Sequence, residues 1–132
     1  MRKIVIAGSA YFYKEALELK EELENNNYEV IDYPKNIDVT NEDEYKEAYE
    51  RFYDSVSRTD DIILFNLDKK GIKGYIGYES FAEISNLIVK KIQTNNDHKI
   101  YIYKMPSKEV GCYDEIEHFL KLGYIEIYKE DE

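Results

Sequence analysis

Ile62-Ile63-Leu64-Phe65, with Asp60-Asp61 before it and Asn66-Leu67-Asp68 after it, is the stretch of sequence that decides the fold. A run that is apolar at every position predicts a strand buried on both faces, here over residues 61–67. Strands of this kind are typical of parallel sheets that helices cover on both sides. The stretch therefore predicts an α/β fold, provided that helices flank it in the sequence.

Strands and helices alternate on both sides of this stretch. Further strands are expected over residues 3–7, 28–33, 98–103 and 124–128, and helices over residues 13–25, after Thr40, and over 80–93 and 113–122. Because a helix joins each pair of strands, right-handed crossovers predict a five-stranded parallel sheet in the order 2-1-3-4-5. The expected fold class is an α/β, flavodoxin-like three-layer sandwich. It forms one domain over residues 1–128, with a solvated tail at 129–132.

Helix signals add detail to two of these elements. Thr40, with Asp43 three residues later, has capping-box spacing and is expected to cap the second helix. One face of that helix is expected to carry Tyr45, Ala48, Tyr49, Phe52 and Val56. The buried stripe of the third helix is expected to be Phe81, Ile84, Leu87, Ile88 and Ile92.

The composition excludes several classes of protein. The chain has 132 residues and a formal charge of −10, from 18 basic and 28 acidic residues. This balance disfavours sequence-independent binding to nucleic acid polymers and docking on an anionic membrane. The apolar stretch that follows Met1 is too short for a signal peptide or a membrane span. A small ligand held in one pocket is compatible with all of these observations.

The cysteines, histidines and tyrosines limit the possible cellular location and partners of the protein. Cys112 is the single cysteine and has only His98 and His118 beside it, which excludes a disulfide framework and a structural zinc site. A reducing, cytoplasmic location fits that count. The 14 tyrosines reflect either an AT-rich genome or an oligomer surface, because aromatic residues are enriched in interface cores.

The loop after the first strand is a candidate ligand loop. In sheets of this order, ligands bind beyond the carboxyl ends of the strands, near the point where the strand order reverses. Gly8 permits a sharp turn there, and Ser9 can cap the next helix or offer its hydroxyl to a ligand. A capped turn without a ligand explains the same residues. The spacing of G-x-G-x-x-G and of a P-loop is missing, which disfavours dinucleotide and P-loop sites.

The loop after the third strand contains Gly71, Gly74 and Gly77. Glycines let a backbone approach a ligand closely or let a loop move, although a flexible surface loop is the alternative. The helix that follows carries Glu79 and Glu83 on one face. The helix dipole accounts for Glu79 without any function. Glu83 is a candidate nucleophile, general base or ligand for sugar hydroxyls, with a solvated or salt-bridged carboxylate as the alternative.

Several of these segments together resemble the nucleoside 2-deoxyribosyltransferase superfamily, in particular its small members. The resemblance is carried by Ile4–Ser9, by residues 60–69, by Gly71-Ile72-Lys73-Gly74-Tyr75-Ile76-Gly77 and by Glu79–Ile84. It covers nearly the whole chain and is most specific over residues 60–84. It implies a flavodoxin-like fold, no metal or redox cofactor, a homo-oligomer, and cleavage or transfer of the N-glycosidic bond of deoxynucleosides or their 5′-monophosphates.

The resemblance also implies roles for individual residues. Glu83 stands at the position of the family's glutamate nucleophile, and Asp68 or Glu79 would protonate the departing base. Asn66 and Asp68 occupy the place of polar groups that bind base or sugar, and Tyr11 that of a pocket aromatic. The substrate-binding residues expected on these grounds are Gly8, Ser9, Tyr11, Asn66, Gly74 and Gly77.

One position departs from the family pattern. The well-studied transferases carry an aspartate six residues before the nucleophile, and this chain has Gly77 there. A second hypothesis is therefore a non-catalytic module or sensor that binds nucleosides or nucleotides with the same fold.

Overall fold

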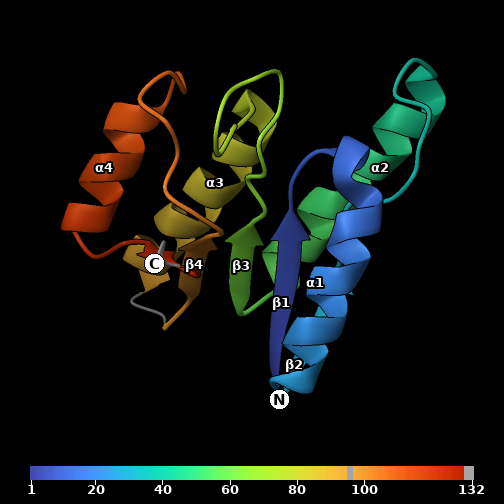
Figure 1. The fold of residues 1–132 in the computed structure, drawn as a ribbon. Coiled ribbons are helices and arrows are strands. Elements are labelled where there is room, and N and C mark those ends of the chain that lie inside the picture. The colour runs from blue at the N-terminus through green and yellow to red at the C-terminus, as the bar shows by residue number, and fades with distance from the viewer. Residues whose placement is uncertain (95–96, 130–132) are drawn as a thin grey trace.

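The computed structural model of the chain describes residues 1–94 and 97–129. The strands are β1 (Arg2–Ala7), β2 (Tyr28–Asp32), β3 (Asp61–Leu64), β4 (Lys99–Ile102) and β5 (Glu126–Ile127). The helices are the 3₁₀ turn η1 (Ala10–Phe12), α1 (Tyr13–Asn25), α2 (Glu42–Arg58), α3 (Tyr78–Thr94) and α4 (Tyr113–Lys121). All strand pairs are parallel and the order is β2-β1-β3-β4-β5, so the α/β, flavodoxin-like prediction is confirmed (Figure 1).

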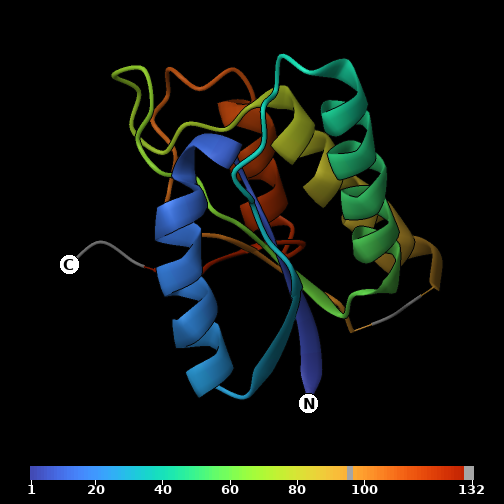
Figure 2. The same ribbon diagram turned by 90° about the vertical axis from the view of Figure 1, so that its right-hand side faces the viewer.

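The sheet separates two hydrophobic cores. α1 packs on one face, against Ile4, Ile6 and Ile63, while α2, α3 and α4 cover the other face (Figure 2). The central strands contribute to both cores because successive side chains point to opposite faces. The apolar residues of β1 and β3 are fully or almost fully buried, as the continuous apolar runs predict.

A cluster of aromatic rings packs beside α1 on the same face of the sheet. Tyr103 contacts Phe65 edge-on, with ring centroids 4.9 Å apart, and stacks against Tyr128 at 6.1 Å. Tyr101 meets Tyr128 edge-on at 5.9 Å. All four side chains belong to the second core or pack against it. Part of the high tyrosine content therefore serves packing within the chain.

The predicted cap of α2 is wrong by one residue. Asn41 is the N-cap, and its Oδ1 accepts the N–H of Glu44 at 3.1 Å. The hydroxyl and the N–H of Thr40 both donate to Asp38 Oδ1, at 2.6 and 3.0 Å. Thr40 is thus held in a local turn with Asp38 and leaves the capping position to its neighbour.

Two other predictions about extent need correction. Ile92, expected in the buried stripe of α3, is 57% exposed. α3 has 17 residues and is longer than β3 and β4, which have four residues each. Its last turn therefore extends beyond the sheet. β3 ends at Leu64 instead of Leu67, where Asn66 N–H turns back to Leu64 O at 3.1 Å.

The C-terminal segment returns to the sheet edge as far as Lys129. The Lys129 N–H donates to Tyr103 O at 2.9 Å, so this residue is attached to the domain and not part of a free tail. The rest of the expected tail, residues 130–132, lies outside the described residues. Within the described ranges, every helix is too short or too polar to cross a bilayer.

Candidate functional site

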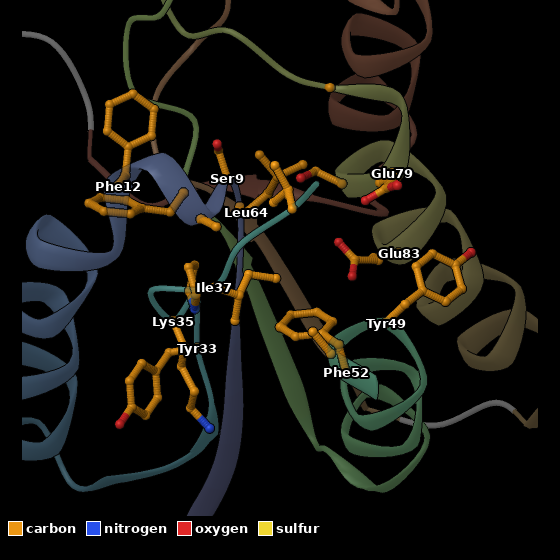
Figure 3. A pocket seen from close by; sticks show the side chains of 18 of the residues that line it. Ser9, Phe12, Tyr33, Lys35, Ile37, Tyr49, Phe52, Leu64, Glu79 and Glu83 are labelled. Atoms are coloured by element: carbon orange, nitrogen blue, oxygen red, sulfur yellow. The ribbon is translucent and has the colours of Figure 1, made fainter. Parts of the chain in front are cut away.

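A cavity of about 520 Å³ opens at the carboxyl ends of β1 and β3 (Figure 3). Its walls come from the loop after β1, the segment that links β2 to α2, the first half of α2 and the beginning of α3. β1 pairs with β2 on one side and with β3 on the other, so the cavity lies where the strand order reverses. This is the place at which the sequence predicts a ligand site.

Glu83 is the most informative side chain on the cavity wall. It lies in the second turn of α3, and its carboxyl group points into the space between α3 and the ends of the strands (Figure 3). Burial raises the pKa of Glu83 to about 8, with further increases from the negative charges of Glu79 and Asp32. At neutral pH this carboxyl group is therefore mostly protonated, whereas an exposed glutamate would be ionised.

Glu79 lies one turn earlier on the same helix and lines the same cavity. It belongs to the first turn of α3, where the helix dipole stabilises a negative charge. Unlike Glu83, it is exposed to solvent. Two carboxyl groups of different environment thus face one cavity from one helix.

Lys69 and Ser9 form a polar patch on the cavity wall. The Lys69 ammonium donates to Ser9 Oγ at 3.0 Å and lies 5.8 Å from the ring centroids of both Tyr11 and Tyr75. Ser9 also accepts the Tyr11 N–H at 3.2 Å, so it caps η1, while the N-cap of α1 is Phe12. The predicted capping role of Ser9 therefore applies to the 3₁₀ turn.

The sharp turn at Gly8 also brings two chain segments close together. A Cβ at Gly8 would lie 3.2 Å from Phe65 O, tighter than ordinary van der Waals contact. A side chain here would press on the backbone that leaves β3 and shift the cavity wall.

Asn66 and Gly74 connect the loops behind the cavity and are absent from its lining. Asn66 is 1% exposed and donates from Nδ2 to Gly74 O at 3.2 Å and to Lys104 O at 2.7 Å. The Lys104 N–H returns a bond to Asn66 Oδ1 at 3.1 Å. Gly74 has a φ of +63°, and a Cβ there would lie 2.8 Å from Pro106 Cα. Both residues are thus required for the shape of the loop.

Asp68 belongs to the same loop structure. Its Oδ1 accepts the Gly74 N–H at 2.9 Å and pairs with the Lys104 ammonium. The hydrogen bond from Lys104 holds the pKa of Asp68 below its usual range, with a further contribution from the Gly74 N–H. Asp68 is therefore an ionised group engaged with the loop, and it lies outside the cavity lining.

The structure divides the nine predicted site residues into two groups. Gly8, Ser9, Gly77, Glu79 and Glu83 line the cavity together. Tyr11, Asn66, Asp68 and Gly74 do not belong to its lining. Tyr11 is 73% exposed and touches Phe12 edge-on beside the Lys69 ammonium. The first loop and the third helix therefore meet at the cavity as expected, and the polar groups directly after β3 do not.

Asp32, at the end of β2, is a residue that sequence reasoning missed. It is 1% exposed and accepts bonds from Ser55 Oγ at 2.8 Å, Tyr33 N–H at 2.8 Å and Arg51 Nε at 3.3 Å. Its charge contributes to the raised pKa of Glu83. An aspartate at the carboxyl end of an expected strand was the signal available in the sequence.

The tyrosines of α2 are a second feature whose role at the cavity was not predicted. Tyr45 and Tyr49 both line it, together with Ala48 and Phe52 of the same helix. The sequence predicts these residues on one face of the helix but does not assign that face to a site. Of the expected face, only Phe52 and Val56 are buried.

No family model, curated protein or solved structure matches the chain. Among residues 1–94 and 97–129, no three His, Cys, Asp or Glu side chains come close enough to hold a metal ion. The arrangement of carboxyl groups, aromatic rings and the Lys69–Ser9 patch is therefore the basis for a functional proposal.

Proposed function

We propose that the protein cleaves or transfers the N-glycosidic bond of a nucleoside or nucleoside 5′-monophosphate, with Glu83 as the nucleophile. The observation that carries this proposal is the Glu83 carboxyl group, withdrawn from water on the wall of a cavity of about 520 Å³. A second carboxyl group, Glu79, lies one helical turn away on the same wall. A pair of carboxyl groups is the equipment that glycosidic bond cleavage requires.

The reaction has two steps. Ionised Glu83 attacks the anomeric carbon, a C–O bond forms, and the electron pair of the C–N bond leaves with the base. The base takes up a proton as it departs. Water or an N–H nitrogen of a second base then attacks the same carbon, gives its proton to the group that protonated the first base and releases the Glu83 carboxylate, which yields hydrolysis or transfer, respectively.

Glu79 is the better of the two candidate proton donors. Asp68 is held ionised by Lys104 and lies outside the cavity lining. A carboxylate that a lysine stabilises in its charged form is a poor acid at neutral pH. Glu79 lines the cavity, is exposed to solvent and belongs to the same helix as the nucleophile, so we assign to Glu79 the transfer of a proton between solvent and the departing base.

The proposal is tested with a panel of ribo- and deoxynucleosides and their 5′-monophosphates, with and without an acceptor base. Release of free base, followed by chromatography, is expected for at least one of them. Glu83→Gln and Glu83→Ala should lower that rate at least about 10³-fold, because nucleophilic catalysis is lost. Glu115→Gln, on the exposed face of α4, is the matched control and should keep full activity. Unchanged base release in both Glu83 variants contradicts the assignment.

Gly77 favours a second candidate function, a non-catalytic module that binds nucleosides or nucleotides. Gly77 lines the cavity, and in the sequence it stands where the transferases that the chain resembles carry an aspartate. Saturable thermal stabilisation by a member of the same panel, with no product after prolonged incubation, would support this alternative.

We also propose that the protein acts as a homo-oligomer in a reducing, cytoplasmic setting. The single cysteine, Cys112, is buried and unpaired, which suits that setting. Tyr11 and Tyr78 are 73% and 85% exposed, and exposed aromatic rings are frequent at interfaces between subunits. A monomer mass by light scattering at working concentration contradicts the oligomer.

A further inference from the structure

The tyrosines of α2 form a continuous aromatic row along one side of the helix. Tyr45, Tyr49 and Tyr53 are spaced four residues apart, so they share one face. The ring centroids of Tyr45 and Tyr49 are 6.1 Å apart and the planes are inclined by 27°. Those of Tyr49 and Tyr53 are 4.8 Å apart and inclined by 47°. Each ring is thus supported by its neighbour.

The first two rings of this row belong to the cavity that holds Glu83. Tyr45 and Tyr49 both line it, and Figure 3 shows Tyr49 on the α2 side of the cavity and Glu83 on the α3 side. Tyr49 is 43% exposed, so a large part of its ring is open to solvent. An exposed aromatic surface that lines a cavity is a typical contact for a flat apolar ligand.

Most of the other aromatic rings of the cavity are less available to a ligand. Phe12 and Phe52 are each 8% exposed and belong to the cores. Tyr33 and Tyr75 each have two lysine ammonium groups within 6 Å of their ring centroids. Tyr78 is 85% exposed, but a Cβ at Gly111 would lie 3.6 Å from its hydroxyl, so its side chain extends toward the loop before α4 and not toward Tyr49.

We propose that Tyr49, supported by Tyr45, is a stacking platform that binds the planar base of the ligand. This inference depends on the proposed function for the identity of the ligand, a nucleoside or nucleotide. Stacking requires the ring and not the hydroxyl, and it tolerates any base because every base has a π face. A bicyclic purine presents a larger π surface to the Tyr49 ring than a pyrimidine does, so purines should bind more tightly.

The test measures binding of free adenine, which has no glycosidic bond and therefore cannot turn over. Isothermal titration calorimetry is performed on wild type, Tyr49→Leu and Tyr49→Phe. The leucine variant keeps an apolar side chain without a π face and should weaken adenine binding about 5- to 100-fold, the range for loss of one base–aromatic stack. The phenylalanine variant keeps the ring and should stay within about twofold of wild type. Cytosine should bind more weakly than adenine.

Several results overturn the platform. They are no measurable adenine binding by wild type, an unchanged affinity in Tyr49→Leu, equal losses in the leucine and phenylalanine variants, or cytosine binding as tight as adenine. Circular dichroism and the thermal midpoint of each variant establish that it is folded.

Glu83→Gln separates this inference from the proposed function. If glycosidic cleavage fails for every nucleoside but the Tyr49 variants alter adenine affinity as expected, the catalytic proposal is wrong and the platform stands. If cleavage depends on Glu83 but Tyr49→Leu leaves adenine affinity unchanged, the platform is wrong and the catalytic proposal stands.

Discussion

Asn66 and Lys104 are joined by two hydrogen bonds, one in each direction between the amide side chain and the backbone. Asn66 Nδ2 donates to Lys104 O at 2.7 Å, and Lys104 N–H donates to Asn66 Oδ1 at 3.1 Å. A third bond, to Gly74 O, uses the remaining donor of the amide. The pair connects the loops that follow β3 and β4. The chain between β3 and α3 is thereby anchored, and α3 carries Glu79 and Glu83.

This geometry predicts a structural role for Asn66. Asn66→Ala leaves one buried and one partly buried carbonyl group and one N–H without their partner and should lower the free energy of unfolding by about 2–4 kcal/mol. Urea denaturation at neutral pH measures the change. Asn86→Ala, on the exposed side of α3, is the control and should change stability by less than about 0.5 kcal/mol. Unchanged stability together with a large rise in KM would instead indicate direct ligand binding.

Gly74 and Gly71 offer a matched pair of substitutions. Both have positive φ, +63° and +75°, so alanine costs about 1–2 kcal/mol of backbone energy at either position. At Gly71 a Cβ has nothing within 4 Å, whereas at Gly74 it would lie 2.8 Å from Pro106 Cα. Gly74→Ala should therefore be less stable than Gly71→Ala by a further 1–3 kcal/mol or so, measured by denaturation. Equal losses would show that the contact with Pro106 relaxes freely.

The sequence predicts the fold well because buried parallel strands have a local signature. Ile62–Phe65 is apolar at every position, and helix-spaced segments flank it, so the sheet order follows from general rules of connection. The ends of the helices are less predictable. The Asp38–Thr40 turn and the exposed end of α3 at Ile92 depend on short-range competition and on the length of neighbouring strands.

The position of the candidate site could be predicted, but only some of the residues that line it. Glu83 and Ser9 lie at the expected edge of the sheet because the switch point is a property of the topology. Asn66 and Asp68 follow a strand at the same edge, yet their side chains turn to Gly74 and Lys104. Which partner a polar loop residue selects depends on contacts between distant segments, and a single sequence does not contain that information.

The stability of the protein should depend on pH through Glu83. Its pKa is about 8 in the fold against a usual value of 4.5, so the native state holds a proton that the unfolded state has lost between these two values. The stabilising effect of the neutral form is complete below the lower value and is lost as the pH rises through the upper one. Glu83→Gln, which stays neutral, should be more stable than wild type by about 2–3 kcal/mol at high pH, after allowance for solvent screening. The free energies of unfolding of the two proteins should become equal in acid. A constant difference between them from pH 4.5 to about 8 would contradict a raised pKa of Glu83.

Lys69 should discriminate between a nucleoside and its 5′-monophosphate. Its ammonium lies 3.0 Å from Ser9 Oγ on the cavity wall and offers the charge that a phosphate requires. If the substrate carries a phosphate, Lys69→Met should lower kcat/KM for the monophosphate about 10- to 100-fold and leave the nucleoside unaffected. Lys70→Met, at the exposed neighbouring position, is the control. Equal losses for both substrates would mean that Lys69 maintains the shape of the loop and does not bind the phosphate.

The dependence of the rate on pH separates the possible roles of Glu83. A nucleophile must be ionised, so kcat/KM should rise with pH and level off above an apparent pKa of about 8. A rate that falls above that value would instead identify Glu83 as a proton donor. Asp32 lies outside the cavity lining, but its negative charge helps to raise the Glu83 pKa. In Asp32→Asn the increase of kcat/KM with pH should therefore occur at lower pH than in wild type. The control is Asp54→Asn, which changes an exposed aspartate that pairs with Arg58 on α2. It should leave the pH dependence of kcat/KM unchanged.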